Sequence, residues 1–131
     1  MKTRPALVSA LIPLALTACS QEYPAERPAV APAAKVVGEP VSCIPLHQFQ
    51  QTVIRDDWTI DFIGAGKKVW RNTLTSRCPS LKSENAITYE TSLSQLCNTD
   101  IVYVLRNVAG RLERGPACGL GQFVPVELEK K

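Results

Sequence analysis

The chain has few histidines, methionines and aromatic residues, and it has no long apolar run. Of its 131 residues, one is histidine and one is methionine, and aromatic residues make up only 6%. A single histidine (His47) and the lack of any Cys-x-x-Cys pair argue against a zinc site. No apolar run is long enough for a helix that spans and stays in a bilayer. We find no internal repeat, and no sequence pattern calls for a cofactor.

Residues 1–18 have the pattern of a secretion signal. Lys2 and Arg4 precede an apolar run from Ala6 to Leu16. The stretch Leu16-Thr17-Ala18-Cys19 resembles a bacterial lipoprotein cleavage box. The resemblance implies cleavage before Cys19, a lipid on its sulfur and an acyl chain such as palmitate on its amine. Several acyl chains on one residue would hold the protein firmly on a membrane.

The expected location of the protein is the bacterial cell envelope. Ser20 follows the cysteine, and its similarity to sorting signals of Gram-negative lipoproteins implies the outer membrane, facing the periplasm. We predict that residues 19–40, rich in proline and alanine, form an extended tether. Residues 41–131 are then one small domain.

The net charge of the mature chain is close to zero. The formal charge is +3, from 15 basic and 12 acidic residues. Lys2 and Arg4 leave with the signal, so 13 basic residues face 12 acidic ones. Such a chain has no global field to gather nucleic acid, and we expect no nucleic-acid partner.

Four further cysteines give the domain its framework. In an exported chain Cys43, Cys78, Cys97 and Cys118 are expected to form two disulfides. The preferred pairing is Cys78–Cys97 with Cys43–Cys118, because it closes one local loop and joins the ends of the domain. The crossed pairing, Cys43–Cys97 with Cys78–Cys118, is nearly as well supported.

The alternation of apolar and polar residues predicts an all-β fold. We expect a small disulfide-stapled antiparallel barrel or sandwich of about six short strands, with at most one helical turn, at Ser92–Cys97. The expected strands cover residues 51–55, 58–63, 69–74, 86–91, 101–105 and 122–128.

The connections between these strands carry local signals. Asp56-Asp57 predicts a turn and Gly64-Ala65-Gly66 a tight hairpin. Residues 101–105 are apolar on both faces, which indicates a central strand. Residues 107–116 are expected to form a loop, and Pro125 places the last strand at an edge.

A set of short motifs resembles one known family. They are Cys43-Ile44, Val53-Ile54-Arg55-Asp56-Asp57, Thr59-Ile60, Val69-Trp70-Arg71-Asn72, Arg77-Cys78-Pro79, Tyr89-Glu90-Thr91-Ser92, Leu96-Cys97 and Cys118-Gly119-Leu120-Gly121-Gln122-Phe123, in that order. Together they resemble an uncharacterised family of short bacterial lipoproteins, domain of unknown function 6491. The resemblance implies an exported, cysteine-framed domain and supplies no activity or ligand.

Few residues suggest chemistry. His47 is a candidate general base, and Asp56, Asp57 and Asp61 form the densest acidic group, although a turn explains the first two better. Cys118 would be reactive only as a free thiol. No motif context supports a catalytic set, so we assign no catalytic residue.

Two basic patches are candidate binding surfaces. Lys67, Lys68, Trp70 and Arg71 would suit anionic lipid heads or cell-wall polymer, although alternation sends Trp70 and Arg71 to opposite faces. A second patch contains Arg106, Arg111 and Arg114, and ordinary surface exposure explains it better.

The sequence favours a non-enzymatic binding or structural module, anchored in the membrane and meeting an envelope protein or a cell-wall component. Two alternatives stay open. One is a hydrolase of an envelope polymer, built on His47 or the aspartates, and the other is an inhibitor of an envelope enzyme.

Overall fold

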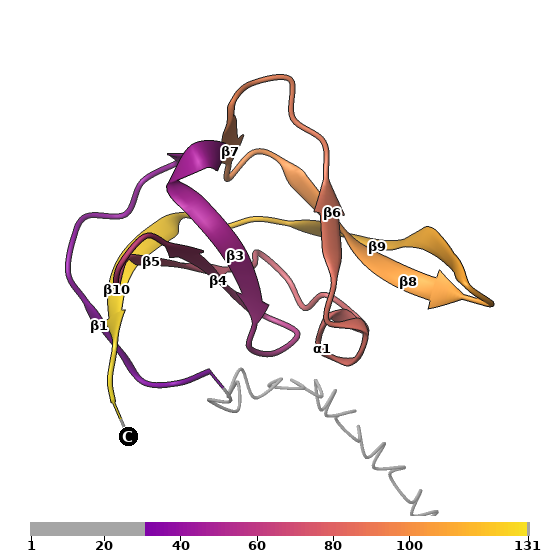
Figure 1. The fold of residues 1–131 in the computed structure, drawn as a ribbon, viewed down its shortest axis with the longest axis horizontal. Helices are drawn as coiled ribbons and strands as arrows, with labels where there is room; N and C mark the ends of the chain where they lie inside the picture. The colour runs from indigo at the N-terminus through magenta and orange to yellow at the C-terminus, as the bar shows by residue number, and fades with distance from the viewer. Residues whose placement is uncertain (1–30, 131) are drawn as a thin grey trace, which may run out of the picture.

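The computed structural model describes residues 31–130, and this part of the chain is mostly antiparallel β-sheet (Figure 1). The all-β prediction is confirmed, but these residues form ten strands instead of about six, and the sheets do not close into a barrel. A five-stranded sheet has the order β1(Ala34–Val36), β10(Phe123–Leu128), β5(Val69–Thr73), β4(Thr59–Gly64) and β3(Phe49–Ile54). A two-stranded sheet pairs β2(Cys43–Pro45) with β7(Gln95–Cys97), and a third sheet has the order β6(Ile87–Tyr89), β8(Ile101–Val108) and β9(Arg111–Gly119).

The predicted meander is present as β3, β4 and β5. Ile60 and Phe62 of β4 lie opposite Asn72 and Trp70 of β5, and all four side chains are buried on the inner face. Asp56 Oδ1 accepts a hydrogen bond of 2.7 Å from the backbone N–H of Trp58, which confirms the aspartate turn between β3 and β4. Alternation alone is thus enough to define this part of the fold.

One core is shared by all three sheets. Aromatic rings stack edge-to-face within it, with centroids 5.1 Å apart for Phe49–Phe62 and 5.4 Å for Phe62–Phe123. The buried members are Ile44, Ile54, Ile60, Phe62, Trp70, Leu74, Cys78, Leu81, Leu96, Val102, Val104, Cys118, Leu120 and Phe123. The two-stranded and three-stranded sheets each supply only a few of these residues, so both depend on the shared core.

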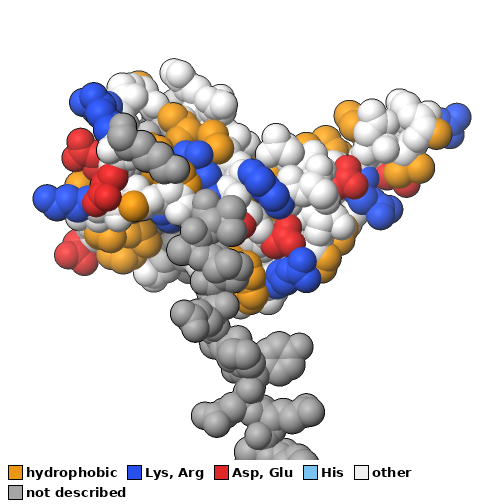
Figure 2. All heavy atoms as spheres, turned by 90° about the horizontal axis from the view of Figure 1, so that it is seen from below, with side chains coloured by type: hydrophobic (Ala, Val, Ile, Leu, Met, Phe, Trp, Pro, Cys, Tyr) orange, Lys and Arg blue, Asp and Glu red, His pale blue; other side chains and the backbone are white. Residues whose placement is uncertain are grey.

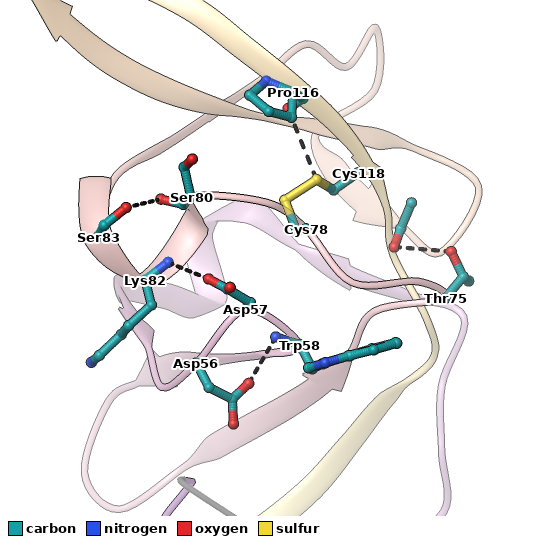
Figure 3. Close-up of a disulfide and its surroundings, with 11 residues drawn as sticks. Asp56, Asp57, Trp58, Thr75, Cys78, Ser80, Lys82, Ser83, Pro116 and Cys118 are labelled. Carbon is teal, nitrogen blue, oxygen red and sulfur yellow. Dashed lines mark hydrogen bonds between the residues drawn. A yellow bond between two sulfur atoms is a disulfide. The ribbon is translucent and has the colours of Figure 1, made fainter. Parts of the chain in front are cut away.

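The preferred disulfide pairing is wrong, and the crossed pairing is the one observed. Cys43 and Cys97 are directly opposite each other in the β2–β7 ladder and are bonded. Cys78, just before the short helix α1(Leu81–Glu84), is bonded to Cys118 of β9 (Figure 3). Spacing favoured a local loop, but strand register decides which cysteines meet.

The ordered domain begins earlier than residue 41. Ala34–Val36, expected in the tether, form β1 and pair with β10. Consequently β10 is not the edge strand that Pro125 suggested, because β1 takes that position. The carbonyl of Pro125 accepts a hydrogen bond from the N–H of Val37, just beyond the end of β1. The proline nitrogen, which has no hydrogen to donate, lies on this same side of β10.

Two local expectations are corrected. Ser92–Cys97 is not helical, because Gln95–Cys97 form β7; the helical turns are α1 and the 3₁₀ turn η1(Leu46–Gln48). Residues 107–116 are not a loop but most of a long hairpin, in which β8 continues to Val108 and β9 starts at Arg111. Ala109 and Gly110, at φ of 50° and 81°, make its two-residue turn.

The segment after β9 is fitted closely against β5. The side-chain amide of buried Asn72 donates to the carbonyl of Gly121 at 2.7 Å and accepts its N–H at 2.9 Å. A Cβ atom on Gly121 would lie 2.1 Å from the carbonyl oxygen of Thr73. Glycine is therefore required there by close backbone approach, not by turn geometry.

We expect both disulfides to contribute strongly to stability, and Cys78–Cys118 more strongly. They span 54 and 40 residues, for which loop closure predicts about 4 kcal/mol each. Only Cys78 and Cys118 belong to the core, so Cys78→Ala/Cys118→Ala also removes packing. Urea unfolding should show a larger loss for this pair than for Cys43→Ala/Cys97→Ala, and an equal or smaller loss would contradict the packing role.

Candidate functional site

The outer face of the five-stranded sheet, opposite the core, carries a buried ionic cluster. Asp61 of β4 is fully buried and lies directly opposite Arg71 of β5. Arg71 Nε donates to Asp61 Oδ1 at 2.8 Å, and Arg71 Nη2 donates to Oδ2 at 2.9 Å. Arg55 Nε donates to the same Oδ2 at 2.7 Å. Both carboxylate oxygens are thus fully engaged by two guanidinium groups.

Arg71 also connects this cluster to the N-terminal segment. Its Nη1 donates to the carbonyl of Pro32 at 2.8 Å. The hydrogen bonds that Arg71 donates to Asp61 raise the pKa of Arg71 above its ordinary value, and they outweigh the burial that lowers this pKa. Arg71 thus joins the segment before β1 to the middle of the sheet.

A groove lies beside this cluster on the same molecule, near the ends of β1, β5 and β10. Its volume is about 690 Å³. The apolar lining side chains are Ile63, Val69 and Leu128. Charged lining residues are Lys35, Lys67, Glu127, Glu129 and Lys130. The left side of Figure 2, over β1 and β10, shows hydrophobic side chains flanked by charges of both signs.

The first predicted basic patch does not form one surface. Lys68 Nζ lies 4.7 Å from the centroid of the buried Trp70 ring, while Arg71 binds Asp61 on the outer face. Lys67, two residues before Val69, lines the groove. Alternation along the strand therefore separates the four residues into Lys68 with Trp70 and Lys67 with Arg71.

The other candidate catalytic residues lie in different elements, namely the turn between β3 and β4, η1 and β9. Asp57 Oδ1 accepts the N–H of Lys82 at 2.9 Å and Oδ2 accepts from Arg77 at 2.7 Å, which connects the turn to α1 (Figure 3). His47 is exposed in η1. Cys118 is in a disulfide and is not a free thiol. Each of the three aspartates accepts a different hydrogen bond, and Asp56 also acts electrostatically on Arg71, the partner of Asp61.

The second basic patch lies along the β8–β9 hairpin. Arg114 forms an ion pair with Glu90 and lies 5.2 Å from the ring centroid of Tyr103. Arg106 and Arg111 are exposed and lie opposite Glu113 and Val108 across the hairpin. Opposite charges are thus interspersed among the arginines.

The predicted anchor, Cys19, lies outside the described residues. Within residues 31–130, no helix is long and apolar enough to cross a membrane, and no cluster of three or more acidic, histidine or cysteine side chains could hold a metal ion. No protein family, curated protein or solved structure matches the chain. The resemblance to the lipoprotein family stays a prediction.

Sequence reasoning missed the two features that define the outer face. Asp61 looked like one member of an acidic group, and its burial depends on Arg55 and Arg71 lying on neighbouring strands. The groove depends on β1, which the proline-rich segment did not predict. The sequence signal that could have revealed the cluster was Asp61 and Arg71, which lie on the polar side of two consecutive alternating strands.

We expect Asp61→Asn to destabilise the domain by about 3 kcal/mol, because it leaves two partly buried guanidinium groups without a counter-charge. The variant keeps the shape of the side chain. Urea unfolding measures the loss. Glu90→Gln, which breaks the exposed pair with Arg114, is the matched control and should change stability little. Equal effects of the two variants would show that the cluster is not a structural element.

Proposed function

We propose that this protein is a lipid-anchored protein of the bacterial envelope whose β domain is a non-enzymatic binding module. Its anchor would be Cys19 in the outer membrane. The groove beside β1 and β10 would bind an acyl chain, with an anionic head group at its lysine rim. The observation that carries this proposal is the groove itself, an apolar concavity edged by lysines.

The chemistry of the groove supports an amphiphilic ligand. Its volume of about 690 Å³ is within the range of sites for small molecules. Ile63, Val69 and Leu128 offer apolar contacts, and Lys35, Lys67 and Lys130 outnumber Glu127 and Glu129. Apolar area favours a hydrocarbon chain, while the net positive rim favours a carboxylate or phosphate head.

The state of the other candidate residues favours binding over hydrolysis. The carboxylates of Asp56, Asp57 and Asp61 accept hydrogen bonds that stabilise a turn, an inter-element contact and the buried cluster. A pair of carboxylates working on a sugar polymer needs both groups facing one substrate. We therefore propose structural roles for all three aspartates.

The envelope address is supported by the signal at residues 1–18, by the cleavage box that ends at Cys19 and by cysteine usage. Two disulfides are typical of proteins exported to an oxidising compartment. A groove for an amphiphile also suits a protein that is held next to a lipid surface.

The groove is tested by titrating the purified full chain with the fluorescent fatty acid cis-parinaric acid. We expect saturable binding that Ile63→Glu abolishes, because a carboxylate would enter the apolar lining. Lys67→Glu should weaken binding about two- to fivefold by reversing one rim charge.

Lys68→Glu is the matched control for Lys67→Glu, since the two lysines are neighbours and only Lys67 lines the groove. It should leave binding unchanged. Thermal unfolding of each variant checks that the fold is intact. No saturable binding by the unaltered chain, or equal effects of the two lysine variants, would refute the groove as the binding site.

The anchor is tested independently in a bacterial host fed with labelled palmitate. The unaltered chain should take up the label and sediment with membranes. Cys19→Ser should remove both properties, because it removes the sulfur that accepts the diacylglycerol. Label retained by Cys19→Ser would contradict the proposed anchor.

A further inference from the structure

The β8–β9 hairpin projects from the body of the molecule as an arm. It extends beyond β6, which pairs with β8 only at residues 102–104, to the right of Figure 1 and the upper right of Figure 2. At the tip of the arm, Leu112 is 69% exposed, the highest value among the exposed large hydrophobic side chains of the described residues. Strand β9 is an edge strand, so one side of its backbone is open for pairing.

The register of the hairpin fixes which backbone groups face this open edge. The two-residue turn Ala109-Gly110 closes with Val108 and Arg111 as a hydrogen-bonded pair. Leu105 donates its N–H to Ala86, on the side away from β9, which gives the same alternation. The N–H and C=O of Leu112 therefore point out from the edge of the sheet.

The side chains around Leu112 are complementary to themselves when a second strand runs antiparallel. If Leu112 lies opposite Leu112 of a second copy, Arg111 lies opposite Glu113 of that copy, and Glu113 opposite Arg111. Arg111 and Glu113 share one face of the strand and Leu112 occupies the other. We propose that the arms of two copies of this chain pair through β9, centred on Leu112, to form a two-fold dimer.

The neighbouring registers do not offer this match. Centring the pair on Arg111, Glu113 or Arg114 places two identical charges opposite each other, which is unfavourable. Centring on Leu112 also makes positive and negative side chains alternate across the new sheet. Glu113 would lie between Arg106 of its own arm and Arg111 of the second copy. Two backbone hydrogen bonds, two ion pairs and one Leu–Leu contact form the centre of this isologous interface.

The test co-expresses two differently tagged full-length copies, extracts them in mild detergent and measures co-purification. Arg111→Glu in both copies, or Glu113→Arg in both, should lower co-purification about tenfold, since two attractive pairs become repulsive. One copy with Arg111→Glu and the other with Glu113→Arg should pair again. So should two copies that carry both substitutions.

This charge swap distinguishes pairing from damage to the hairpin. A damaged hairpin in one copy would not regain co-purification through a substitution in the other copy. Glu84→Arg, an exposed reversal on α1, should leave co-purification unchanged. Failure of unaltered copies to co-purify, or failure of the swapped combination to recover, would overturn the dimer. Fatty-acid binding in the groove is measured separately, so either proposal can fail alone.

Discussion

Two disulfides stabilise a fold in which three sheets share one core of modest size. Cys43–Cys97 bridges facing residues of a ladder of three pairs, and Cys78–Cys118 joins the start of α1 to β9 within the core. Without them the chain would have to offset its conformational entropy with a core of modest size. The Cys78–Cys118 bond joins β9 to the segment that follows β5, so it ties the β8–β9 hairpin to the five-stranded sheet.

The five-stranded sheet is used differently on its two faces. Its inner face supplies the aromatic centre of the core, from Phe62 and Phe123. On the outer face, Asp61 occupies the middle of the sheet with two arginines, and Arg71 holds the chain at Pro32 in place. Because this contact leads directly into β1, the ionic cluster also positions a wall of the groove. The buried carboxylate of Asp61 thus has a structural role, because both of its oxygens accept hydrogen bonds from arginine side chains.

The sequence predicted the local structure of the meander well, but it missed β7 and the β8–β9 hairpin, and it predicted long-range structure poorly. The alternation in residues 58–63 and 69–74, the Asp56-Asp57 turn and the glycine hairpin each depend on near neighbours, and the structure has all of them. Cysteine pairing, the position of Pro125 and the burial of Asp61 depend on strand register and on which strand covers which edge. β1 shows the reason: Ala34–Val36 have little strand signal of their own and are ordered by the open edge of β10. Gly121 also depends on long-range packing, because the backbone of β5 excludes a side chain there.

Non-reducing peptide mapping of the protein extracted from membranes tests the structural account most directly. Because strand register decides which cysteines meet, the account predicts one linked peptide containing Cys43 and Cys97 and another containing Cys78 and Cys118. A link between Cys43 and Cys118, or between Cys78 and Cys97, would contradict the arrangement of the sheets and with it the groove and the arm.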